Sequence, residues 1–287
     1  MVKAEKKPRV NKHGLPRAIP AEIKRLVRKR CGFGCVICGL GIYEYEHFNL
    51  EFNKAKIHEA DGITLLCPNH HTKKTTGKLS VETVRIFNAE PKALRQGFAS
   101  EHLDLRTQNP VVILGTARFV STPVLIQLEE EPILMIKPGE DEEEPFLLSA
   151  TIRDKNGEII LQIVDNQWQT PANYWDVTSE GKYLRIRSAS KQVELVLRQE
   201  PPDTIVIERL KMAHKGFKIE VSEGVPMSIT NAYGGDMNIS GTTSVSYLFL
   251  KDAVGFGLPS HYTPKQGLEL MKDIAESDRL HLFNFPR

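Results

Sequence analysis

The placement of cysteine constrains this chain more than any other feature, because all four cysteines lie within residues 31–67 of 287. Cys35 and Cys38 form a C-x2-C pair, and Cys67 and His70 form a second pair with the same spacing. Two such pairs can place four sulfur and nitrogen donors around one ion, in the tetrahedral arrangement that structural zinc prefers. A redox dithiol or a group of buried free thiols would use the same residues, but the second pair favours zinc. Cys31 is left over, and we expect it to be a free or buried thiol.

The charge is distributed unevenly along a chain whose net charge is only +2. Residues 1–30 carry eleven basic and two acidic side chains, which leaves the remainder mildly acidic. A basic segment of this kind is typical of contact with a polyanion, although a solvated tail would show the same charge. No apolar stretch approaches the roughly 20 residues that a membrane helix needs, and no apolar block follows the basic N-terminus. We therefore expect a cytoplasmic protein without membrane contact.

The first third of the sequence predicts a flexible basic arm at residues 1–18 and a small mixed domain at residues 19–108. Helices are expected where a proline or a capping serine precedes apolar residues at helical spacing, and strands where β-branched and aromatic residues cluster. The expected elements are a helix after Pro20, one strand or a hairpin at 42–52, a strand at 62–66, a helix after Pro68 and a helix from Ser80 to about Ala89.

From about residue 110 the periodicity changes from helical to alternating, and turn signals recur along the chain. Asn156-Gly157 is the plainest of these signals, since this pair readily takes the positive φ angles of a tight hairpin. The pattern predicts an antiparallel sandwich or barrel of roughly ten strands over residues 109–287. A final helix is expected from Thr263, which begins a capping box. The predicted fold class is α+β, with a small zinc-stabilised domain, a larger all-β domain and a C-terminal helix.

Glu46 and His47 lie between the two metal pairs, and His71 follows the last expected zinc ligand directly. Neighbours on a helix point about 100° apart, so a His70 that faces zinc turns His71 toward a different surface. A carboxylate and two imidazoles that converge beside the zinc would form a second metal site with an adjacent general base. This combination suits phosphodiester hydrolysis, because a divalent cation neutralises the phosphate while a neutral histidine takes a proton from water. A surface Glu-His pair and an alternate zinc ligand are the simpler interpretations.

The motifs Cys-Val-Ile-Cys, Glu-His and Leu-Leu-Cys-Pro-Asn-His-His occur in register over a segment within residues 20–90. Their order resembles the HNH endonuclease family, and the resemblance implies a ββα-metal core for this segment. It implies His47 as the general base, with Glu46 and His71 at a catalytic site that takes Mg²⁺ or another divalent cation. It also implies structural Zn²⁺ on four ligands, which are Cys35, Cys38, Cys67 and His70.

One position departs from the family pattern. The family's Asn usually stands five residues before the third Cys, and that place is Gly62 here, which offers no ligand atom. Either His58 or Asp61 substitutes for it, or the site is degenerate. Asp61 offers the hard oxygen that Mg²⁺ prefers, whereas His58 offers a nitrogen better suited to Mn²⁺, Ni²⁺ or Zn²⁺. We favour His58, because Asp61 beside a glycine is readily explained as a turn former.

Basic side chains before and after the zinc pairs are candidates for contact with phosphates, although each could also belong to a solvated helix face. These residues are Lys24, Arg25, Arg28, Lys29, Lys73 and Lys74. The sequence therefore favours a metal-dependent HNH endonuclease that acts on DNA, of a restriction or phage-defence type, with a regulatory or targeting β-rich domain. The alternative is a catalytically decayed HNH-like zinc module that binds nucleic acid. An interaction protein without nucleic-acid affinity is a third possibility, and the β-rich domain could mediate a homo-oligomer or bind an activating partner.

Overall fold

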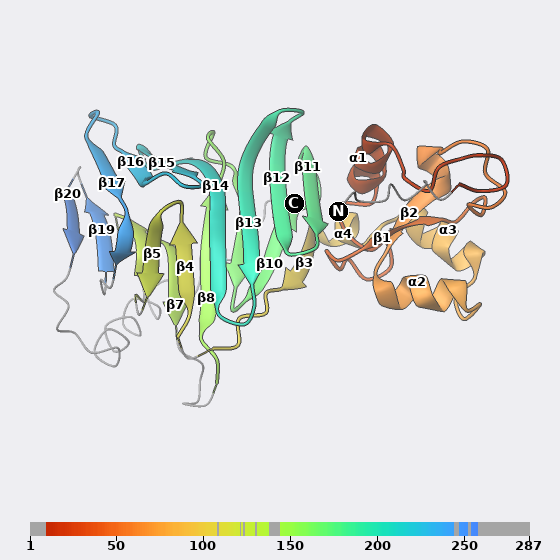
Figure 1. The fold of residues 1–287 in the computed structure, drawn as a ribbon, viewed down its shortest axis with the longest axis horizontal. Helices are drawn as coiled ribbons and strands as arrows, with labels where there is room; N and C mark the ends of the chain where they lie inside the picture. Colours follow the sequence, from red (N-terminus) through yellow and green to blue (C-terminus); the bar gives the residue numbers. More distant parts are fainter. Residues whose placement is uncertain are drawn as a thin grey trace, which may run out of the picture. The chain divides into compact units, whose positions relative to one another are not determined.

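The computed structural model describes residues 10–257 apart from 108, 121, 123, 130, 138–143, 244–246 and 252–253. The chain divides into two compact units, residues 1–100 and 101–287, so the division falls earlier than the expected boundary after residue 108 (Figure 1). Helices belong to the first unit and strands dominate the second, which makes the fold mainly β within the α+β class. No helix among the described residues is long and apolar enough to cross a membrane. The predicted helix from Thr263 lies outside the described residues, as does the arm before Val10.

The described part of the first unit contains short helices around a two-stranded sheet. Its elements are α1 (Ala21–Arg30), β1 (Glu44–His47), η1 (Ala60–Gly62), β2 (Ile63–Leu66), α2 (Pro68–Thr75), α3 (Val81–Ala89) and α4 (Lys92–Gln96). Strands β1 and β2 are antiparallel, with His47 opposite Ile63, and α2 follows β2 after a single residue. The strand predicted at 42–52 is shorter than expected, because the chain turns after the Phe48 amide donates to the Gly62 carbonyl.

The core of the first unit forms around β2, all four residues of which are buried. Val27 of α1 and Val84 of α3 pack with Leu65 in one apolar cluster that also includes Cys35 and Cys67. The helix predicted from Ser80 is present, and the Ser80 hydroxyl accepts from the Thr83 amide, as an N-cap requires. Burial of these apolar side chains therefore connects the helices to the segments that carry the predicted zinc ligands.

The second unit consists of two large sheets. Its strands, together with β3 at the division, are β3 (Phe98–His102), β4 (Val111–Leu114), β5 (Ala117–Val120), β6 (Val124–Leu128), β7 (Glu131–Lys137), β8 (Leu147–Arg153), β9 (Ile159–Val164), β10 (Gln167–Pro171), β11 (Asp176–Glu180), β12 (Tyr183–Ala189), β13 (Gln192–Glu200), β14 (Thr204–His214), β15 (Phe217–Ser222), β16 (Met227–Thr230), β17 (Asp236–Ile239), β18 (Gly241–Thr243), β19 (Tyr247–Lys251) and β20 (Val254–Gly257). One sheet has the order β20-β19-β6-β7-β8-β9-β10-β3. The other has the order β11-β12-β13-β14-β15-β16-β17, with β4, β5 and β18 attached through β14.

Two features of these sheets differ from the sequence prediction. There are more strands than expected, because short strands such as β17 carry few apolar residues and give no clear alternation. The sheets are also not wholly antiparallel, since β14 with β4, β18 with β5 and β19 with β6 are parallel pairs. Parallel pairing joins strands that are distant in sequence, so a local turn signal cannot reveal it.

A buried carboxylate at the predicted Asn-Gly turn joins the two sheets. Asp154 is only 3% exposed, and its Oδ1 accepts from the amides of Asn156 and Glu158 in the turn between β8 and β9. Its Oδ2 accepts from the Tyr174 hydroxyl at 2.9 Å, and its carbonyl accepts from the Ala213 amide of β14. The predicted hairpin is therefore confirmed, and the same residue ties one sheet to the other.

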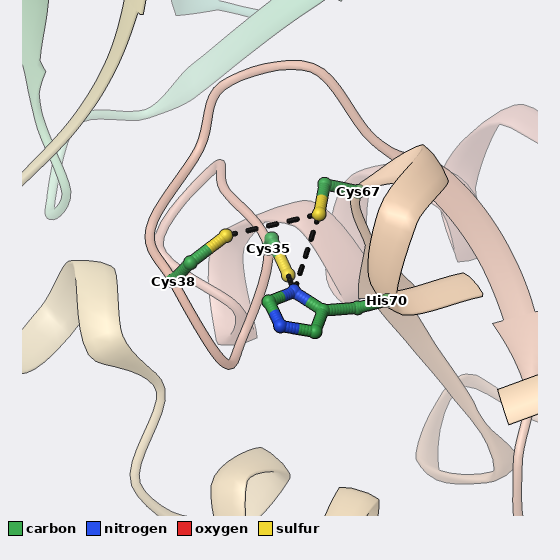
Figure 2. Close-up of side chains that lie close together, drawn as sticks. All are labelled: Cys35, Cys38, Cys67 and His70. Carbon is green, nitrogen blue, oxygen red and sulfur yellow. Dashed lines mark hydrogen bonds between the residues drawn. The ribbon is translucent and has the colours of Figure 1, made fainter. Parts of the chain in front are cut away.

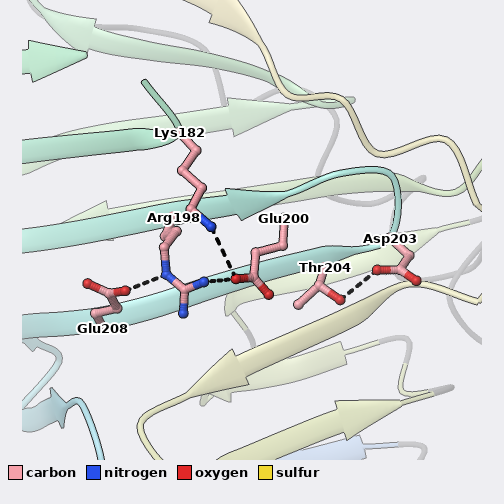
Figure 3. Close-up of polar contacts among 6 residues, drawn as sticks. All are labelled: Lys182, Arg198, Glu200, Asp203, Thr204 and Glu208. Carbon is pink, nitrogen blue, oxygen red and sulfur yellow. Dashed lines mark hydrogen bonds and ion pairs between the residues drawn. The ribbon is translucent and has the colours of Figure 1, made fainter. Parts of the chain in front are cut away.

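A group of ion pairs in the other sheet includes one that links β13 to β14 (Figure 3). The Arg198 guanidinium contacts both Glu200 and Glu208, and Lys182 approaches Glu200 at 3.4 Å. Beside them, the Thr204 hydroxyl donates to Asp203 at the start of β14. Opposite charges on adjacent strands favour one register over a slipped one. The Arg198 and Glu208 side chains are only 17% and 15% exposed, whereas the exposed pair of Lys182 with Glu200 adds little free energy.

Gly115 gives a test of the packing in the second unit. It turns the chain between β4 and β5 at φ +63°, and a Cβ there would lie 2.2 Å from the Val225 carbonyl oxygen. Gly181 has a similar φ of +58° but open space around it. We expect Gly115→Ala to lower the free energy of unfolding by about 3 kcal/mol and Gly181→Ala by about 1 kcal/mol. Urea denaturation followed by tryptophan fluorescence measures this unit alone, because Trp168 and Trp175 both belong to it. Equal losses in the two variants would contradict the packing.

Candidate metal centre

Four donors from two separate segments meet in the first unit (Figure 2). Cys35 and Cys38 lie in the loop after α1, Cys67 immediately precedes α2, and His70 is in the first turn of that helix. The His70 Nδ1 lies 3.5 Å from the Cys35 Sγ and 3.2 Å from the Cys67 Sγ, and the two sulfurs of Cys38 and Cys67 are 3.8 Å apart. Bonds of about 2.3 Å to sulfur and about 2.0 Å to nitrogen give tetrahedral edges of about 3.5–3.8 Å. All four donor atoms lie within 4.8 Å of one another, so the set could hold one zinc ion.

The cysteines of this cluster influence one another's ionisation. A hydrogen bond from Cys38 lowers the pKa of Cys35 to about 5, and the same interaction raises the pKa of Cys38. A thiolate is the form that binds a metal, so one ligand is available without a further proton loss. Among the described residues, no other group of three or more His, Cys, Asp or Glu side chains brings its donor atoms this close together.

Backbone hydrogen bonds hold the first pair of ligands in place. The Cys35 amide donates to the Leu40 carbonyl at 2.8 Å, and the Val36 amide donates to the Leu65 carbonyl of β2 at 3.0 Å. The loop is so tight that a Cβ on Gly34 would lie 2.6 Å from the Gly39 carbonyl oxygen. Glycine at this position therefore allows the close approach that brings the two sulfurs to one side.

Cys31 takes no part in the cluster. It is fully buried in the core, and its Sγ lies 3.8 Å from the Thr64 hydroxyl. Burial raises the pKa of the Cys31 thiol, which keeps it protonated and unreactive. The predicted role as a buried free thiol agrees with this placement.

The predicted carboxylate and second imidazole meet between β1 and α2. His71 Nε2 lies 2.9 Å from a Glu46 oxygen, and His71 Nδ1 lies 3.0 Å from a Glu44 oxygen. The other Glu46 oxygen is 2.5 Å from the Lys74 ammonium. The side chains of Glu46 and Lys74 are only 12% and 14% exposed, so water screens this contact weakly. Glu44 was not singled out in the sequence, although alternation along a strand places it on the same face as Glu46.

His47 meets His58 instead. The His47 Nε2 lies 3.1 Å from the His58 Nδ1, and the His58 Nε2 lies 2.8 Å from the Pro16 carbonyl oxygen. The Phe52 ring contacts both imidazoles, at centroid distances of 5.5 Å to His47 and 6.2 Å to His58. Burial, followed by the neighbouring His58, lowers the pKa of His47, while Glu46 acts in the opposite direction. The half-buried His47 is thus favoured in its neutral form, as a general base requires.

Asp61 lies in a different environment. Its carboxylate is fully exposed and pairs with the Arg30 guanidinium at 3.1 Å, and Arg30 also donates to the carbonyl of Ala60. The adjacent Gly62 has nothing within 4 Å of the place where a Cβ would stand. The contacts therefore bring His58 rather than Asp61 to the predicted base.

The basic residues are placed less uniformly than the sequence pattern indicates. Arg28 is only 6% exposed and donates to the Tyr45 hydroxyl at 2.7 Å, so its charge is turned inward. Lys24 lies over the Tyr45 ring, and Arg25 forms an exposed pair with Glu22. Lys29 and Lys73 are exposed, and Lys74 contacts Glu46 as described above. Fewer of these basic side chains are therefore exposed than the sequence pattern predicted.

Residues 10–17 belong to the folded unit and not to a free arm, which corrects the predicted extent of residues 1–18. Asn11 is 8% exposed, and its amide nitrogen donates to the carbonyls of Phe52 and Ala55. The Arg17 guanidinium lies over the Phe52 ring at 5.6 Å. The sequence pattern did not reveal this contact, and the one signal present was Asn11 followed by Gly14, which is typical of a turn.

Comparison of the chain with protein-family models, with curated proteins and with solved structures finds no match.

We predict that Cys67→Ser removes the bound metal and unfolds the first unit, because metal binding and folding are coupled at a site of this kind. Cys31→Ala removes a thiol of the same core without touching the donor set and is expected to keep one zinc per chain. Elemental analysis after gel filtration, with circular dichroism of the helical signal, checks both variants. A wild-type protein that is folded and free of zinc would contradict the assignment.

Proposed function

We propose that the first unit is an HNH-type nuclease module that hydrolyses phosphodiester bonds in DNA with the help of a divalent cation. The observation that carries this proposal is the contact of Glu46 on β1 with His71 on α2. His71 directly follows His70, which belongs to the donor set that could hold zinc. The order of the elements β1, β2 and α2 agrees with the ββα-metal core that the sequence resemblance implies. Glu46 also acts on the pKa of His47, so the base lies within electrostatic reach of the acidic residue.

Each residue has a distinct task in this proposal. Glu46 and His71 would hold the catalytic cation, which when bound supplies positive charge to the scissile phosphate and to the leaving oxygen. His47 takes a proton from the attacking water, since burial favours its neutral form. Exposed Lys29 and Lys73 contact phosphates on either side of the cleaved bond. Mn²⁺ and similar ions suit a site with one imidazole and one carboxylate better than Mg²⁺ does.

Lys74 also has a role in the proposed nuclease site. Its ammonium and the cation compete for Glu46, because the carboxylate contacts Lys74 at 2.5 Å. Release of Lys74 leaves a mobile positive charge next to the scissile phosphate, where it favours the bound nucleic acid. The acidic Glu44 contacts the other nitrogen of His71 and keeps this ring oriented toward Glu46.

The same contacts favour a second candidate function, a zinc-stabilised module that binds nucleic acid without cutting it. Both nitrogens of His71 face carboxylate oxygens, and a lysine already neutralises Glu46. A site that is satisfied internally in this way, with Gly62 in the place of the family's Asn, could have lost its cation. The two candidates differ in one result, because both bind DNA and only the nuclease cleaves it.

For the second unit we propose a role in recognition. A nuclease of a restriction or phage-defence type needs a part that recognises its target or its activating signal, and we assign this task to the β-rich unit. It could act as a surface for a second copy of the chain or for an activating partner.

We predict that His47→Ala abolishes cleavage of supercoiled plasmid in the presence of Mn²⁺ or Mg²⁺, with a loss of about 10²–10⁴-fold, as is typical for a general base. Zinc content and DNA affinity should not change, because the side chain adds rate and not structure. His13→Ala, which removes an exposed imidazole of the same unit, is the matched control and should cut normally. Full activity of His47→Ala would show that the base is misassigned. A wild-type protein that binds plasmid and leaves it intact would favour the second candidate.

We also predict that exposed lysines of the first unit set the salt dependence of DNA binding. Lys29→Gln combined with Lys73→Gln should make the plot of log K against log salt shallower by about 2, since each lost phosphate contact contributes about 0.9. Lys191→Gln with Lys218→Gln removes the same charge from exposed positions of the second unit and should leave the slope unchanged. Fluorescence anisotropy of labelled duplex over a salt series measures both. Equal slopes in the two double variants would place the DNA elsewhere.

A further inference from the structure

The hydrogen bonds around His58 determine which ring nitrogen carries the proton in each of the two histidines, His58 and His47. The Pro16 carbonyl oxygen can only accept, so the proton of a neutral His58 lies on Nε2, at 2.8 Å from that oxygen. The His58 Nδ1 then carries a lone pair and accepts from the His47 Nε2 at 3.1 Å. His47 is therefore left with an unprotonated Nδ1.

We propose that the Pro16 carbonyl and His58 form a positioning relay that holds His47 in the tautomer whose Nδ1 is the basic nitrogen. His58 acts through His47 and is not a ligand of the catalytic cation. This inference rests on the proposed nuclease function, since it specifies how the general base of that site is oriented.

The relay explains why neither loop residue supplies the ligand that the family's Asn would offer. A metal ligand needs a free lone pair in the plane of its ring, and both nitrogens of His58 are occupied by Pro16 and His47. Asp61 points to Arg30 and is fully exposed. A cation held by Glu46 and His71 would complete its shell with water, as hard divalent cations usually do.

The segment that carries Pro16 is itself fixed against the loop that carries His58. The Asn11 amide nitrogen donates to the carbonyls of Phe52 and Ala55 at 2.6 and 2.7 Å. Its side-chain oxygen accepts from the amides of His13 and Leu15 at 2.9 and 3.0 Å. One buried asparagine therefore joins the two segments, and the acceptor for His58 stays in place without a contribution from substrate or cation.

Nitrogen-15 NMR tests the relay directly. The zinc-loaded full chain, labelled with ¹⁵N histidine, is recorded without other divalent cations at a pH above the usual histidine range. Long-range ¹H–¹⁵N spectra, assigned with single histidine variants, are expected to show both His47 and His58 with the proton on Nε2. A proton on Nδ1 of either ring would overturn the relay.

Two substitutions at His58 separate positioning from metal binding. His58→Gln keeps an amide N–H for Pro16 and an amide oxygen for His47, and should retain kcat within about tenfold of wild type. His58→Leu removes both and should lower kcat by about 10²-fold, with KM for plasmid unchanged. Zinc content reports folding of each variant, and the Mn²⁺ concentration for half-maximal rate is expected to stay at the wild-type value in both.

The outcomes distinguish this inference from the function on which it rests. If both His58 variants need more Mn²⁺, or if His58→Gln is as slow as His58→Leu, the relay is wrong while the nuclease stands. If the wild-type protein does not cut DNA, the proposed function fails, and the NMR spectra still decide whether His47 is held in the stated tautomer.

Discussion

The arrangement of the first unit depends on one donor set that could hold a metal such as zinc. It brings two cysteines of a tight loop together with a cysteine and a histidine at the start of α2. The core beneath it is small, with ten buried residues among those described, which include Val27, Leu65 and Val84, and with nine partly buried apolar residues around them. A core of this size provides limited stability, so a metal bound at the donor set would contribute a large part of the folding free energy. Bonds from Cys67 and His70 to that metal would also fix the rotation of α2 about its own axis.

That rotation determines which residue of the helix faces β1. His70 turns to the zinc cluster, and His71, one position later, turns to Glu46 and Glu44. One turn further along, Lys74 reaches the same carboxylate. The chemistry of the proposed site therefore follows from the zinc cluster through the geometry of a single short helix, and a loss of zinc would disperse the site as well as the fold.

The parts of the site that local spacing controls could be predicted from the sequence. The C-x2-C and C-x2-H pairs indicated the donor set, and the helical offset between His70 and His71 indicated that the second imidazole would face elsewhere. The cap at Ser80 and the turn at Asn156-Gly157 are also local signals, and both are present. Within each pair, and at the cap and the turn, the geometry depends on neighbours within four residues. That the two distant pairs meet was inferred from the four donors that one zinc ion needs.

Other features depend on contacts between distant segments, and the sequence pattern did not reveal them. Arg28 fits a basic helix face by its spacing, yet its side chain is buried and donates to the Tyr45 hydroxyl. Asn11 belongs to a segment whose charge suggests a solvated arm, and only the carbonyls of a loop 41 and 44 residues away give it a buried partner. Parallel pairs such as β14 with β4 also join strands that are far apart in sequence, so no local pattern predicts them.

The most direct test of this account is the anomalous scattering of crystals of the full chain soaked in Mn²⁺. We expect zinc at the cluster of Cys35, Cys38, Cys67 and His70, and a separate manganese peak between Glu46 and His71, with the Lys74 ammonium displaced from Glu46. A zinc peak alone, with Lys74 still on Glu46 at saturating Mn²⁺, would contradict the nuclease and leave a zinc-stabilised binding module.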